Sequence, residues 1–242
     1  MPERSRQQLA ECLAQTRALL EDFAALGLDD LYPLQTSPNS QGTDSDNSTS
    51  SSGSREEKGK RLEDIRKEIA DCRRCPLCKN RNNVVFGVGD PDADIVFVGE
   101  APGREEDLKG EPFVGEAGRL LDRILNAMGT DRQHVYICNV EKCKPPENRD
   151  PSAGEIEACE PYLKRQLSVI RPRVIVALGR FAAQTLLKCD TPIGKLRGKW
   201  HEYEGIFLLP TYHPAFLLRN PSAKREAWED MKQVMKQLRE RI

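Results

Sequence analysis

The chain has 242 residues, of which 38% are hydrophobic and 31% charged, and its formal net charge is −1. This composition predicts a soluble monomer with one well-buried domain and an appendage. No stretch approaches the roughly 20 apolar residues of a membrane span, and no signal peptide is recognisable, so we expect no membrane association and a reducing, cytoplasmic location. The balanced charge excludes a global basic footprint, so any contact with nucleic acid must be local.

The first 59 residues are predicted to lie outside the main domain. Within residues 1–32, Leu9, Leu13 and Phe23 follow a helical spacing, which predicts an amphipathic helix. Residues 33–59 are rich in Ser, Asn, Thr, Asp and Gly and contain few apolar side chains. Such a segment cannot bury enough surface to order itself, so we expect a disordered linker.

Residues 60–242 are predicted to form one α/β domain. Short apolar runs indicate strands, and helical patterns separate them. Alternating strands and helices favour parallel strands joined by right-handed crossovers, with helices on both faces. The sequence therefore predicts a three-layer α/β/α sandwich around a mostly parallel four-stranded sheet. The strands are expected at 94–98, 134–140, 173–178 and 206–209, and the helices at 61–70, 117–128, 152–170, 180–188 and 223–238.

Cysteines suggest a metal centre. Cys72, Cys75 and Cys78 are equally spaced, and Cys143 and Cys159 follow far downstream. Four thiolates hold a zinc ion or an iron–sulfur cluster, and a four-cysteine site needs only two of the first three. Zinc modules usually have two tightly spaced pairs, whereas only the first group is tight here. We therefore favour an iron–sulfur cluster, with zinc as the alternative.

Polar residues follow several predicted strands. Gly99, Glu100 and Ala101 come after the first strand, Asn139 ends the second, and His213 follows the fourth. Ligands of open parallel sheets bind outside the carboxyl ends of the strands, so we expect these groups to converge on one rim. Each residue also has a simpler interpretation. The glycine could mark only a turn, the asparagine could cap a strand end, and the histidine could have a structural role.

Five ordered motifs together resemble the family 4 uracil-DNA glycosylases, the iron–sulfur members of the uracil-DNA glycosylase superfamily. The resemblance covers about residues 61–242 and leaves out the N-terminal helix and linker. The motifs are GEAPG at 99–103, KGEPFVGEAG at 109–118, NVEKCKPPENRDP at 139–151, HPAFLLRNP at 213–221 and the four cysteines.

The resemblance implies a 4Fe-4S cluster with Cys72, Cys75, Cys143 and Cys159 as ligands. Cys78 lies where the family need not have cysteine and is left as a spare thiol. The ligands are distant in sequence, so the cluster is expected to join their loops as a structural staple.

The resemblance also implies that the enzyme flips uracil out of single- or double-stranded DNA and hydrolyses its N-glycosidic bond, which leaves an abasic site. Phe113 is expected to stack on the base, Asn139 to read its edge, and His213 to stabilise the leaving uracil anion. Glu100 is expected to position the water, or else to organise the pocket loop. Backbone groups of Gly99 and Ala101 complete this substrate-binding set, together with Glu106, whose alternative is a solvated charge.

The resemblance also implies that the segment of Leu217, Leu218 and Arg219 contacts DNA, with an apolar side chain in the space that the base vacates and Arg219 near phosphate. The alternative for the two leucines is simple packing. Two other functions stay open. One is a DNA-binding iron–sulfur redox sensor, against which the presence of Asn139 and His213 counts. The other is a recruitment protein whose N-terminal helix docks on a polymerase.

Overall fold

The computed structural model describes residues 49–240 as an α/β domain built on a six-stranded sheet. The strand order is β1-β3-β2-β4-β6-β5. The four inner strands are mutually parallel, whereas the two edge strands pair antiparallel with their neighbours. The strands are β1 (Val88–Gly89), β2 (Ile95–Gly99), β3 (Tyr136–Asn139), β4 (Val174–Leu178), β5 (His201–Tyr203) and β6 (Ile206–Thr211).

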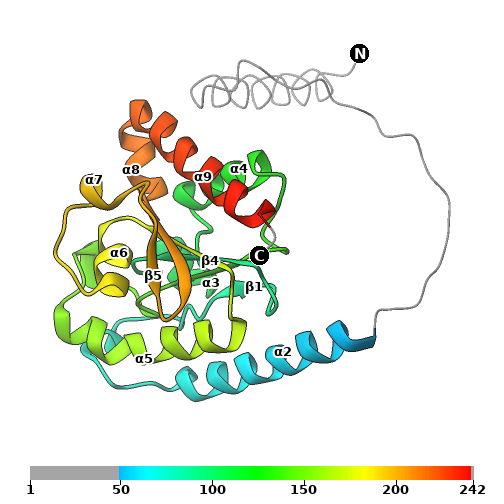
Figure 1. Cartoon of the computed structure of the whole chain (residues 1–242). Helices are drawn as coiled ribbons and strands as arrows, with labels where there is room; N and C mark the ends of the chain where they lie inside the picture. The colour runs from blue at the N-terminus through cyan, green and yellow to red at the C-terminus, as the bar shows by residue number, and fades with distance from the viewer. Residues whose placement is uncertain (1–48, 241–242) are drawn as a thin grey trace, which may run out of the picture.

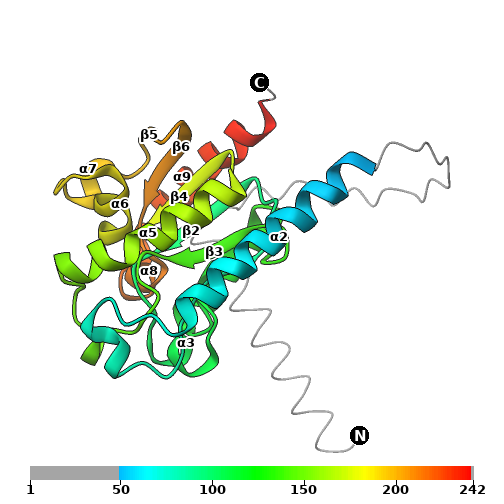
Figure 2. The ribbon, with the colours of Figure 1, turned by 90° about the horizontal axis from the view of Figure 1, so that it is seen from below.

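Helices cover both faces of this sheet, which confirms the predicted three-layer sandwich (Figures 1 and 2). One face carries α2 (Thr49–Ala70), α5 (Ala153–Ile170) and α6 (Arg180–Leu187). The opposite face carries α4 (Glu116–Ala127), α8 (Pro214–Arg219) and α9 (Lys224–Arg239). The shorter elements are η1 (Pro76–Lys79), α3 (Arg104–Lys109), η2 (Pro146–Asn148), α7 (Ile193–Leu196) and η3 (Pro221–Ala223).

The alternation of side chains along β2 explains the two cores. Val96 and Val98 pack under α2 and α5, whereas Ile95 and Phe97 pack under α4 and α9. Successive side chains of a strand point to opposite faces, so a strand between two helical layers is apolar throughout. All five residues of β2 are buried accordingly.

The sheet has six strands instead of the predicted four, because the prediction missed the two edge strands β1 and β5. β1 has two residues and β5 has three, so neither contains an apolar run long enough to indicate a strand. Each is defined instead by pairing with a neighbour, β1 with β3 and β5 with β6.

The helix predicted from residue 61 begins earlier, at Thr49, so the last eleven residues of the predicted linker 33–59 are helical. Tertiary contacts hold this extension. The Arg55 side chain pairs with Asp90 at 3.0 Å, and Lys58 donates to the Ile170 carbonyl at the end of α5 at 2.9 Å. The predicted N-terminal helix and the rest of the linker lie outside the described residues.

Within residues 49–240, no helix has the length and apolar content that a bilayer crossing requires.

Candidate active site

A cavity of about 450 Å³ opens at the carboxyl ends of the parallel strands. The loop after β2, the end of β3 and the start of α8 all contribute to its wall, as expected because ligands of open α/β sheets bind outside the carboxyl ends of the strands. The predicted convergence of a carboxylate, an amide and an imidazole on one rim is therefore observed. The predicted site residues that line the cavity are Glu100, Ala101, Glu106, Phe113, Asn139, His213 and Arg219.

Asn139 lies at the floor of this cavity and is only 2% exposed. It is paired in register with Gly99 of the adjacent strand, and a Cβ atom on Gly99 would lie 2.4 Å from Asn139 Oδ1 and 2.6 Å from the Phe113 ring. Asn139 Oδ1 is buried and has no hydrogen-bond partner among the described residues. A buried amide oxygen without a partner suits a ligand that supplies a donor.

The backbone of Asn139 accepts a hydrogen bond from the buried side chain of Lys142. The Lys142 ammonium is fully buried and donates to the Asn139 carbonyl at 2.7 Å. Burial lowers the pKa of this lysine. A single buried side chain thus fixes the strand end that presents the amide to the cavity, an arrangement that the sequence did not indicate because lysine is typically a surface residue.

Phe113 has a backbone φ of 54°, in the left-handed region that non-glycine residues rarely adopt. Two side chains hold this conformation. Glu106 accepts hydrogen bonds from the Val114 and Gly115 amides at 3.0 and 3.1 Å, and Arg132 donates to the carbonyls of Pro112 and Phe113. Strained backbone of this kind persists only where its surroundings over-determine it, and it is common at functional sites.

Glu106 lines the cavity as expected, and its carboxylate has a further role that was not predicted. Its Oε1 faces the loop of Phe113 rather than solvent, and a Cβ on Gly103 would lie 2.7 Å from its Oε2. The carboxylate positions the aromatic ring, although the residue also lines the cavity.

The His213 ring lies beside Phe113, with 5.5 Å between ring centroids. His213 Nδ1 accepts a hydrogen bond from the Ala215 amide at 3.1 Å and so caps α8. This bond leaves the proton of the neutral ring on Nε2. Burial, together with the positive charge of Arg219, lowers the pKa of His213 to about 4, so the ring is neutral at physiological pH. The structural role of His213 as the cap of α8 is compatible with a functional role, because the cap leaves Nε2 as the donor of the ring.

Glu100 follows β2 and lines the same cavity. Burial raises its pKa to about 7, the nearby negative charge of Asp150 adds to the shift, and Arg180 opposes it. Arg180 is itself paired with Asp150 at 3.0 Å. A carboxyl that titrates near neutrality in a cavity is suited to accept a proton.

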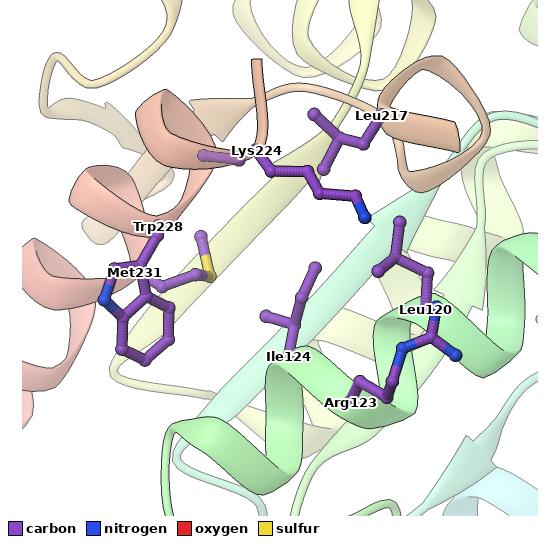
Figure 3. A pocket seen from close by; sticks show the side chains of 8 residues that line it. Leu120, Arg123, Ile124, Leu217, Lys224, Trp228 and Met231 are labelled. Atoms are coloured by element: carbon purple, nitrogen blue, oxygen red, sulfur yellow. The ribbon is translucent and has the colours of Figure 1, made fainter. Parts of the chain in front are cut away.

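Leu217 is not where a DNA contact is expected. It is 1% exposed and packs between α4 and α9, against Leu120, Ile124 and Met231 (Figure 3). The buried side chain therefore favours the packing alternative over the predicted DNA contact. Leu218 is 36% exposed on the same short helix.

The four predicted ligands come from segments that are distant in sequence. Cys143 Sγ accepts a hydrogen bond from Arg81 Nη1 at 3.2 Å, and the same nitrogen donates to the Cys72 carbonyl. Cys159 Sγ accepts from the Lys142 amide at 3.3 Å. Burial raises the pKa of Cys75 and Cys143, and raises that of Cys159 to about 12. A negative charge on Cys72 or Cys75 raises the pKa of Cys143 further, and one on Cys143 raises that of Cys159.

The hydrogen bonds that the sulfurs accept are compatible with a cluster. Within residues 49–240, no group of three or more histidine, cysteine or acidic side chains is arranged to hold one metal ion. A tetrahedral zinc ion requires four sulfurs at about 2.3 Å from one centre, whereas a cluster spreads its thiolates over several iron atoms. Hydrogen bonds to the sulfurs, such as those from Arg81 and Lys142, are a usual feature of cluster sites.

Comparison with known proteins identifies the family of this chain. The family model of the uracil DNA glycosylase superfamily matches residues 86–232. Three proteins named type-4 uracil-DNA glycosylase are close relatives. That of Archaeoglobus fulgidus is 51% identical over 72% of this chain and 91% of its own length. Those of Saccharolobus solfataricus and Thermotoga maritima are each 45% identical, over 73% and 72% of this chain and 86% and 92% of their own lengths. The chain therefore belongs to the type-4 uracil-DNA glycosylase family.

Some residues of the site were not predicted from the sequence. The segment after β3 contributes Asn148, Arg149 and Asp150 to the cavity wall, and α8 contributes Phe216. Asn148 has a positive φ of 53°, as does the preceding Glu147. Two proline residues at 145–146 were the available signal that this segment forms a tight turn.

Proposed function

We propose that this protein removes uracil from single- or double-stranded DNA by hydrolysing the N-glycosidic bond, which releases free uracil and leaves an abasic site. Membership of the type-4 family supports this activity. The observation that carries the substrate assignment is the buried, unpartnered Oδ1 of Asn139 at the floor of a cavity that also contains Phe113 and His213.

The base must leave the stack before it reaches this floor. In the proposed complex, uracil lies against the Phe113 ring, and Asn139 Oδ1 accepts from N3–H while the amide nitrogen donates to the position-4 oxygen. Cytosine has an acceptor at N3 and an amino group at position 4, so both contacts would be mismatched. The Gly99 and Ala101 backbone borders the same space, and the absent side chain of Gly99 leaves room for Asn139 and Phe113.

Charge development decides the role of His213. Breaking the bond between C1′ and N1 leaves the electron pair on uracil, with negative charge on the position-2 oxygen. The neutral His213 ring carries its proton on Nε2, and donation from this nitrogen to the position-2 oxygen stabilises the leaving anion. Donors aimed at developing charge are usually the largest single contribution to catalysis.

Glu100 is the proposed partner of the attacking water. As its oxygen bonds to C1′, the water loses a proton, which the Glu100 carboxylate accepts. The pKa of about 7 leaves a substantial fraction of this group ionised at neutral pH. On the DNA strand, Leu218 is the proposed wedge and Arg219 the proposed phosphate contact, since both are exposed at the end of α8.

Membership of the type-4 family and the hydrogen bonds to the sulfurs of Cys143 and Cys159 support a 4Fe-4S cluster held by Cys72, Cys75, Cys143 and Cys159. When bound, the cluster would tie the segment before β1 to the segment after β3. Cys143 lies four residues after Asn139, so this staple would also steady the floor of the cavity. None of the seven cysteines among the described residues forms a disulfide, and the reducing, cytoplasmic location stays a prediction. A monomer and a protein partner for the N-terminal helix stay predictions.

The decisive experiment measures uracil release from a labelled oligonucleotide with one uracil, alone and paired with guanine, followed by alkali cleavage. We expect abasic sites in both uracil strands and none in a matched thymine strand. Asn139→Ala should reduce release by at least about a hundredfold, and Asn126→Ala on the exposed face of α4 should not. A cluster-loaded protein that binds DNA but releases no uracil would contradict the proposal and favour the redox or recruitment function.

A further inference from the structure

Three side chains form a continuous stack at the mouth of the cavity. The Arg197 guanidinium lies over the Tyr212 ring, 5.3 Å from its centroid, and Tyr212 stacks on Phe216 with 4.8 Å between centroids and 29° between planes. The inner end is anchored, because Arg197 donates to both carboxylate oxygens of the buried Asp230. The stack therefore fixes the orientation of the Phe216 ring.

Phe216 is the outer member of this stack and lines the cavity. It remains 36% exposed, although a phenylalanine side chain is usually buried. Two large hydrophobic residues of α8 are exposed, Phe216 and Leu218. An aromatic ring that is braced on one side and accessible at the mouth of a site has the form of a stacking platform.

We propose that Phe216 stacks on the nucleobase adjacent to the extruded uracil. This inference rests on the proposed function, since extrusion leaves the neighbouring base without its stacking partner. An aromatic ring replaces that partner whatever the sequence, because every base presents a π-face. Leu218 has no ring and cannot serve in this way, and Arg219 next to it supplies a positive charge for the phosphate that joins the two nucleotides. The ligand is thus an unpaired purine or pyrimidine base of the bound strand.

The test is a cycle of binding measurements. Labelled single strands carry one 2′-fluoro-2′-deoxyuridine, which resists cleavage, and the base on its 5′ or 3′ side is either present or replaced by a tetrahydrofuran. Removing the contacted base should weaken binding to the wild-type protein by about fivefold or more. The same removal should change binding to Phe216→Leu by less than twofold, and Phe216→Tyr should behave like the wild-type protein.

Phe207→Leu is the matched control, because Phe207 is 41% exposed and lies at the start of β6, at the opposite end of the strand from the cavity. It should reproduce the wild-type response. If removal of neither base weakens wild-type binding, or if Phe216→Leu loses as much as the wild-type protein, stacking by Phe216 is overturned. Uracil release by the wild-type protein on the natural strand is measured in parallel. Absence of uracil release overturns the proposed function. Uracil release by the wild-type protein, combined with a base-removal effect on binding that is the same with and without Phe216, overturns only this inference.

Discussion

Gly99 and Asn139 are register partners in adjacent parallel strands, and the space that the glycine leaves open is occupied by the asparagine amide and the Phe113 ring. The closeness of this approach shows why the residue after four apolar strand positions is a glycine. Any larger residue would contact the two groups proposed to bind the base. The backbone of one strand thereby sets the position of the functional side chain on the next.

Replacing Gly99 by alanine should damage the site with little effect on the fold. The new Cβ would lie 2.4 Å from Asn139 Oδ1 and 2.6 Å from the Phe113 ring, so both must shift. We expect at least about a tenfold loss in kcat/KM for a uracil oligonucleotide, because small misplacements of positioning groups are costly. The control is Gly154→Ala on α5, where nothing lies within 4 Å of the added Cβ. That variant should keep full activity and gain about 0.5–1 kcal/mol in the free energy of unfolding.

His213→Ala should reduce the single-turnover rate of uracil release by about 100- to 1000-fold. The protein should still bind a strand with an abasic-site analogue. His134→Ala is the control, because this exposed histidine pairs with Asp131 outside the cavity. If His213→Ala retains the wild-type rate, the leaving-group role is wrong.

Because burial holds the pKa of His213 at about 4, the wild-type rate should show no loss from histidine protonation between pH 7 and pH 5.

Glu100 predicts a different pH dependence. Its pKa of about 7 means that the carboxylate is protonated, and unable to accept a proton, at lower pH. The rate of the chemical step should therefore fall as the pH drops below about 7, and Glu100→Gln should be slow and lack this limb.

The folded state holds the Glu100 proton more tightly than the unfolded chain, so ionisation of Glu100 destabilises the fold as pH rises from about 4.5 to 7. Glu100→Gln should thus gain stability relative to the wild-type protein across that range. An unchanged acid limb in Glu100→Gln would assign the limb to another group.

The cysteines separate into ligands and a spare thiol. Cys143→Ser should lose the brown colour of an iron–sulfur cluster and much of the thermal stability, because the cluster is expected to tie segments distant in sequence. Cys78→Ser lies in the same region but should retain iron and colour. Iron and sulfide analysis with visible absorbance is the measurement. Equal loss in both variants would show that Cys78 is also a ligand, and bound zinc would contradict the cluster.

The long apolar elements were predictable because burial on both sides leaves a direct signal in the sequence. β2, β4 and the helices α4, α5, α6 and α9 lie within one or two residues of their predicted bounds. β1 and β5 were missed, because two or three residues carry no periodicity. The start of α2 was missed for another reason. Its first turns are polar, and ion pairs with Asp90 and Asp92 hold them in place rather than local propensity.

Adjacent leucines show the same limit within the site. Leu217 and Leu218 are chemically identical, and the family resemblance predicts a DNA contact for the segment that contains both. The helical geometry of α8 turns Leu217 into the core beside α4 and leaves Leu218 exposed. Only the packing of three helices decides which of the two is accessible.

The sequence by itself determined the family, the layered fold and seven of the residues that line the cavity, because motifs and apolar patterns are local properties of the chain. The tertiary structure decided how these residues are held. It placed Glu106 on the amides beside Phe113, put the His213 proton on Nε2, set a buried lysine beneath Asn139, and aligned Phe216 in a stack with Tyr212 and Arg197. Some of these relations are close in sequence, such as Lys142 with Asn139, and others join distant segments, such as Arg197 with Tyr212. In both cases the distances and burial follow from the packing of the folded chain rather than from residue identity.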